Sequence, residues 1–255
     1  MKTKTISDVI HFLGIEESNV LGNVANLGEH FFLIHNLDRL YHSCMNLRPI
    51  DDKKLKIPLF LYLVVHSEFY NAISSYLRTH KSISFRCMRS ALDCAFTSYY
   101  LLKKPEKLDV YLSKLDENGN TALAKEWNKT FLNIKRTIKN NLVEFPLAKG
   151  LPEIHEFCSL YSHSDAVGIL HRYQEDKESA MLQAKYFDYE TKHSDFHKWL
   201  GCVLVTYFNI WLLYWQEVFI HRADKELQNI EKLILLFQQE LKTYTVKYPF
   251  DVIEQ

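Results

Sequence analysis

Two arginines and an aspartate that recur on one side of a predicted helix are the first candidates for chemistry. Arg86, Arg89 and Asp93 lie in the segment 82–102, SISFRCMRSALDCAFTSYYLL, three, four and seven residues apart, so they share one helix face. The opposite face is small or apolar. Two guanidinium groups on such a face can hold a phosphate while the carboxylate fixes their rotamers. The alternative is a network of ion pairs between helices that binds no ligand.

A histidine in a serine-rich segment is the second candidate. His163 lies in the segment 161–165, YSHSD, and an imidazole can act as a general acid or base near neutral pH. Ser164 stands beside it as a candidate ligand contact. The alternative is helix capping, in which Ser164 or Asp165 caps the next element and His163 complements the C-terminal end of the preceding helix.

Two histidines four residues apart, His193 and His197, form a possible metal pair. His163 and Asp165 could join them, because the tripeptide His-Ser-Asp occurs in both places. The acidic residue between His193 and His197 does not stand where the zinc-protease motif needs it. The alternative is that residues 194–195 cap the start of a helix. We therefore expect no metal and no cofactor.

His171 and Arg172 form a further candidate contact with a ligand. Together with Tyr173 they combine basic and aromatic groups, a combination that suits stacking on RNA bases. On an alternating strand, however, His171 and Tyr173 share one face and Arg172 takes the other. The alternative is therefore the solvated face of a hairpin.

The composition of the chain indicates its fold class and its compartment. The chain has 255 residues with only seven glycines and six prolines, which indicates long helices with few turns. Lysine plus arginine and aspartate plus glutamate number 31 each, so no global basic field attracts nucleic acid. The five cysteines have no metal-binding spacing and predict free thiols in a reducing compartment. Polar residues interrupt the apolar stretch 200–220, so we expect a cytoplasmic protein without a membrane contact.

Helical periodicity predicts an all-α, single-domain helical bundle with a small β-hairpin insertion at about residues 168–189. Residues 1–23 are an N-terminal extension, 24–165 and 190–246 the bundle, and 166–189 the hairpin. The expected helices span 24–47, 58–77, 82–102, 105–115, 121–140, 153–161, 194–221 and 223–244.

Several short motifs resemble bacterial helical-bundle proteins related to HEPN domains. The motifs are Arg-Ser-Ala-Leu-Asp-Cys-Ala at 89–95, Tyr-Tyr-Leu-Leu at 99–102 with a Pro-Glu-Lys turn, and Tyr-Ser-His-Ser at 161–164. The similarity spans about residues 58–222. It implies a four- or five-helix bundle that dimerises and, in many members, a metal-independent ribonuclease of toxin–antitoxin or phage-defence systems.

The chain departs from the active-site motif of that family, in which a histidine follows an arginine by four to six residues on one helix. No arginine here has a histidine at that spacing. A nuclease would have to assemble Arg86 or Arg89 with His163 from different helices. His163 would then move protons during attack by the RNA 2′-hydroxyl, an arginine would stabilise the phosphorane, and Asp93 would orient an arginine.

These observations favour a HEPN-like cytoplasmic protein that binds RNA or a nucleotide through Arg86, Arg89, Asp93 and His163. The competing class is a non-catalytic scaffold that acts by protein–protein contact. In that case the charged stripe is structural, and an aromatic-rich surface around residues 211–215 forms a homodimer or binds a protein partner.

Overall fold

The computed structural model describes residues 6–45, 52–113, 121–162, 173–176, 181–184, 186–189, 192–221 and 227–250. It confirms the all-α helical bundle. The helices are α1 (Val9–Leu27), α2 (Phe31–Met45), α3 (Lys53–Leu77), α4 (Lys81–Lys103), α5 (Leu108–Leu112), α6 (Thr121–Phe131), α7 (Ile134–Asn140), α8 (Leu151–Ser162), α10 (His193–Tyr214) and α11 (Leu227–Lys247), with a π-helical turn, η5, at Trp215–Phe219.

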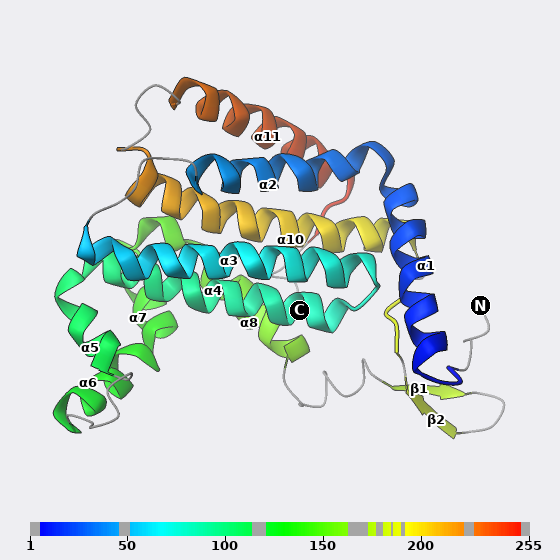
Figure 1. Cartoon of the computed structure of the whole chain (residues 1–255), viewed down its shortest axis with the longest axis horizontal. Helices are drawn as coiled ribbons and strands as arrows, with labels where there is room; N and C mark the ends of the chain where they lie inside the picture. Colours follow the sequence, from blue (N-terminus) through cyan, green and yellow to red (C-terminus); the bar gives the residue numbers. More distant parts are fainter. Residues whose placement is uncertain are drawn as a thin grey trace.

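The long helices α2, α3, α4, α10 and α11 run lengthwise beside one another, while α1 crosses one end of the bundle and α5, α6 and α7 gather at the other (Figure 1). Helix α10 is central, because it packs against α2, α3, α4, α8 and α11. A helix that is apolar on every side belongs in such a position. None of the described helices is long and apolar enough to cross a membrane.

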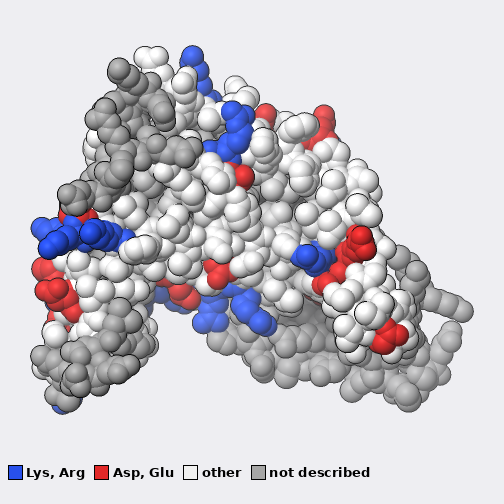
Figure 2. Space-filling model, in the orientation of Figure 1, with Lys and Arg blue, Asp and Glu red and all other residues white. Residues whose placement is uncertain are grey.

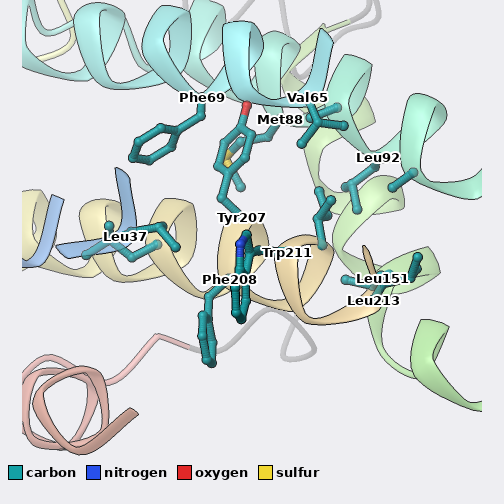
Figure 3. Packing of buried hydrophobic residues seen from close by; sticks show 14 of the residues in the cluster. Leu37, Val65, Phe69, Met88, Leu92, Leu151, Tyr207, Phe208, Trp211 and Leu213 are labelled. Carbon is teal, nitrogen blue, oxygen red and sulfur yellow. The ribbon is translucent and has the colours of Figure 1, made fainter. Parts of the chain in front are cut away.

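The core forms where the apolar faces of α2, α3 and α4 meet α10. Figure 3 shows side chains from all four helices converging, among them Leu37, Phe69, Met88 and Tyr207. Trp211 of α10 is fully buried and its Nε1 donates a hydrogen bond to the carbonyl oxygen of Leu40 at 2.9 Å.

The prediction of an aromatic surface around residues 211–215 is therefore wrong. Trp211, Tyr214 and Trp215 are 0%, 0% and 4% exposed, and they stabilise the core instead of offering an interface. The periodicity could not reveal this, because a helix that is apolar all round has no single buried face.

The N-terminal segment forms a helix before the predicted start at residue 24. Helix α1 begins after Asp8, whose carboxylate accepts a hydrogen bond from the backbone N–H of His11 at 2.8 Å, an N-cap of the usual kind. The segment contains Gly14 and Gly22 and buries only Leu27, so its apolar periodicity is weak.

The helix predicted over 24–47 is interrupted by a 3-10 turn at Gly28–His30, so α2 begins only at Phe31. Other boundaries differ as well. Helix α3 begins at Lys53, because the carboxylate of Asp52 accepts a hydrogen bond from the backbone N–H of Lys54 at 2.9 Å, and Pro58 lies inside the helix. The single helix predicted over 121–140 is broken into α6 and α7. The break lets Phe131, at the end of α6, and Ile138, in α7, both become buried.

Two four-residue strands lie between α8 and α10. β1 (Tyr173–Asp176) pairs antiparallel with β2 (Met181–Ala184), with Tyr173 opposite Ala184. The segments 163–172 and 177–180 lie outside the described residues. That the whole of 168–189 forms an insertion into the bundle therefore stays a prediction.

Candidate functional site

The face of α4 that carries Arg86, Arg89 and Asp93, here called the polar stripe, is on the outer side of the helix. Arg86 and Asp93 are exposed and Arg89 is half-buried. The opposite side of the helix places Met88 and Leu92 in the core, where both are fully buried. The separation of a polar face from an apolar face was predictable from the sequence, because it follows from helical periodicity alone.

Asp93 does not stand alone, because His155 of α8 holds its carboxylate. The distance from His155 Nε2 to Asp93 Oδ1 is 2.9 Å, and the two side chains are 7% and 55% exposed. The other ring nitrogen of His155 is buried and has no hydrogen-bond partner among the described residues. The contact between His155 and Asp93 therefore joins α8 to α4.

Arg89 lies between α4 and α8, close enough to influence the thiol of Cys158. Burial raises the pKa of Cys158 well above its ordinary value, and the charge of Arg89 opposes that rise. Its half-buried position contrasts with that of Arg86, which is exposed and for which the described residues offer no hydrogen bond or ion pair.

The side of α4 that faces α3 uses its polar groups for structure. Ser90 Oγ donates a hydrogen bond to Glu68 Oε1 at 2.9 Å. Burial, with Glu68 nearby, raises the pKa of Cys87 to about 12. The polar groups of α4 therefore differ in their surroundings. Ser90 and Asp93 make contacts between helices, whereas Arg86 points to solvent.

The five cysteines are free, as predicted, and Cys44, Cys158 and Cys202 are buried. Burial raises the pKa of Cys44 and that of Cys202 to about 12. A thiol that stays protonated at neutral pH is a poor nucleophile. The cysteines therefore do not support covalent catalysis.

Four of the predicted site residues, His163, Ser164, His171 and Arg172, lie outside the described residues, as does Asp165. Helix α8 ends at Ser162, directly before His163. The assembly of Arg86 or Arg89 with His163 therefore stays a prediction.

The pair His193 and His197 lies at the start of α10 with its rings 4.5 Å apart. His197 Nδ1 lies 2.8 Å from the hydroxyl oxygen of Tyr244, and its ring stacks on Tyr248 at 4.2 Å. Over the described ranges, no third histidine, cysteine or carboxylate joins the pair as a metal ligand. The alternative, a cap at residues 194–195, is wrong, since the N-cap of α10 is Lys192, without a side-chain hydrogen bond.

Charge is distributed in small groups over the face in Figure 2. Basic side chains there gather in separate places, several beside acidic ones, and most of the described surface between them is uncharged. Among the described residues of this face, no continuous basic stripe supports the binding of a long nucleic acid. On this face the described basic side chains offer only small local groups for a phosphate contact.

Comparison of the chain with protein-family models, with curated proteins and with solved structures found no match in any of the three. The resemblance to HEPN-related proteins therefore stays a prediction.

Proposed function

We propose that the outer face of α4 binds the phosphate groups of RNA or of a nucleotide. The observation that carries the proposal is the arrangement of Arg86 and Arg89 on one face with Asp93, whose carboxylate is held by His155 at 2.9 Å. Guanidinium groups bind phosphate oxygens through charge-assisted hydrogen bonds. Arg86 is exposed, so a ligand can reach it without a change in the core.

The resemblance to HEPN-related proteins extends this proposal to an activity. The protein would act in the cytoplasm as a ribonuclease of a toxin or phage-defence system. In that chemistry the RNA 2′-hydroxyl attacks the neighbouring phosphorus, the 5′-oxygen leaves, and no metal is required. His163 would move the protons and the arginines would stabilise the charge on the phosphorane. Binding does not depend on cleavage, and the two are measured separately.

The binding proposal predicts that Arg86→Ala weakens binding of a fluorescently labelled single-stranded RNA by about 2–10-fold, since a hydrogen bond contributes about 0.5–1.5 kcal/mol net. The loss of one phosphate contact also lowers the slope of log K against log salt by about 0.7. Fluorescence anisotropy over a range of salt concentrations measures both quantities. Arg89→Ala is expected to act in the same direction.

Arg39→Ala is the matched control, because Arg39 is an exposed arginine on α2 and its replacement removes the same charge. It should leave affinity and salt slope unchanged. Equal losses in Arg39→Ala and Arg86→Ala would contradict a specific site on α4, and so would the absence of RNA or nucleotide binding by the wild type. Cleavage is tested by incubating RNA with the purified protein in the presence of EDTA. The wild type should cleave the RNA under these conditions, and His163→Ala should not.

A second candidate function, self-association or contact with a protein partner, is favoured by an exposed apolar strip on α3. Phe60, Leu63 and Val64 are 63%, 49% and 42% exposed, and their spacing puts them on one helix face. Light scattering is expected to give a dimer mass for the wild type and a lower mass for Phe60→Ser. A wild-type monomer over the whole concentration range would contradict the dimer.

A further inference from the structure

A cluster of four polar side chains lies at the contact between α2 and α3, away from the stripe of α4. Asp38 and His42 are four residues apart on α2, and His66 and Tyr70 are four residues apart on α3. Residues at this spacing lie above one another on a helix face. The two pairs face each other across the interhelical contact.

The donor atoms of the cluster are within reach of one another. His66 Nε2 lies 2.9 Å and His42 Nε2 3.6 Å from Asp38 Oδ1. Tyr70 Oη donates a hydrogen bond to the same carboxylate oxygen at 2.8 Å and lies 3.0 Å from His42 Nε2. One ligand atom from each of Asp38, His42 and His66 can be chosen so that all three lie within 4.8 Å of one another.

These separations suit a common metal ion. Nitrogen and oxygen ligands bind first-row ions such as Zn²⁺ at about 2.0–2.2 Å, so ligands of one ion lie about 3–3.5 Å apart. The two separations from Asp38 Oδ1, 2.9 Å and 3.6 Å, lie close to this range. Two imidazoles and one carboxylate are also a set that zinc and non-haem iron sites use, with positions left open for water or substrate.

The surroundings hold one ligand firmly and leave another open to solvent. The His66 side chain is 7% exposed, and its ring stacks on Tyr41 at 5.0 Å with an angle of 13°. The His42 side chain is 52% exposed and that of Asp38 24%. A buried, stacked ring that presents Nε2 to the cluster is an ordered donor, and His42 provides the route by which an ion enters.

The cluster also lies at the wall of a cavity. A cavity of about 370 Å³ between α1, α2 and α3 is lined by Asp38 and Tyr70 together with apolar side chains such as Ile34 and Ile73, and by Arg78. Binding sites commonly combine an apolar lining with a few polar groups. An ion bound to Asp38 would have its open positions next to this space.

We propose that Asp38, His42 and His66 bind a divalent first-row transition-metal ion, and that Tyr70 orients the carboxylate of Asp38 through its hydrogen bond. Binding at His66 Nε2 places the proton of that ring on Nδ1. When the ion binds, the two histidine nitrogens contact the metal instead of contacting the Asp38 carboxylate directly. This site is independent of the phosphate-binding face of α4.

The test is titration of the EDTA-treated, dialysed full chain with Zn²⁺ by isothermal calorimetry. The wild type is expected to bind one Zn²⁺ per chain. His42→Ala and Asp38→Asn should weaken binding by more than the about 10–100-fold typical of an outer-shell residue, and Tyr70→Phe by an amount within that range. Zinc should also raise the Tm of the wild type, because an ion bound only by the folded state stabilises it.

His221→Ala is the matched control, since His221 is exposed and lies outside the cluster. It should bind zinc as the wild type does, and circular dichroism of each variant verifies the fold. Failure of the wild type to bind Zn²⁺ or Mn²⁺ at millimolar concentration would overturn the proposal. So would undiminished binding by both His42→Ala and Asp38→Asn, which would place the ion elsewhere, for instance on free thiols.

Discussion

Replacement of Trp211 by alanine is expected to lower the free energy of unfolding by about 3–5 kcal/mol, the range for removal of a large aromatic side chain from a core. The indole is fully buried and stacks on Trp215 at 5.5 Å and on Phe208 at 6.1 Å. The substitution leaves a cavity in the core beside α10. It also removes the hydrogen bond from Trp211 Nε1 to the Leu40 carbonyl oxygen. Equilibrium unfolding in urea measures the loss.

Leu235→Ala is the control for this measurement, because Leu235 is 64% exposed on α11. A surface substitution of this kind changes stability by less than about 0.5 kcal/mol. A loss below about 1 kcal/mol in Trp211→Ala would be incompatible with a buried side chain in a packed core.

The second large effect is a loss of stability between pH 6.5 and pH 4 caused by His197. Burial, aided by the neighbouring charges of His193, His30 and Lys247, lowers the pKa of His197 from 6.5 to about 4. The contacts agree with this direction. Nδ1 lies against the Tyr244 hydroxyl, which also donates a hydrogen bond to the His197 carbonyl, and Nε2 is buried without a partner among the described residues. A second proton on the ring would thus be a buried charge without a partner.

The sign of the effect follows from proton linkage. Between pH 4 and pH 6.5 the unfolded chain binds a proton at His197 that the folded chain does not. The contribution of His197 to the free energy of unfolding is therefore complete above pH 6.5 and is lost as the pH falls toward 4. Since one pKa unit corresponds to about 1.4 kcal/mol, a pKa lowered from 6.5 to about 4 predicts a loss of about 3–4 kcal/mol.

Unfolding curves measured across this range for the wild type and for His197→Phe give the difference directly. Phenylalanine keeps an aromatic ring beside Tyr248 but cannot take a proton, so the stability of the variant should fall less steeply with acid. His221→Ala removes an exposed histidine and should leave the slope unchanged. Parallel curves for the wild type and His197→Phe would show that His197 is not the group responsible.

The amino-acid sequence determined those features that depend on local spacing. Scarce glycine and proline, together with apolar residues at intervals of three and four, were enough for the all-α class and for the shared helix face of Arg86, Arg89 and Asp93. The free state of the cysteines also follows from their spacing. Each of these depends on which face of one helix a residue occupies, and that is a property of the chain itself.

Only the tertiary structure decided which faces meet. It joined Asp93 to His155, sixty-two residues later, and it buried Trp211 in the core. It also brought the pair Asp38 and His42 against the pair His66 and Tyr70. The spacing of four in each pair was a signal in the sequence, but nothing local specifies that α2 packs beside α3 at that height. Such contacts are set by the packing of whole helix surfaces around α10, and that packing depends on every apolar side chain in the core.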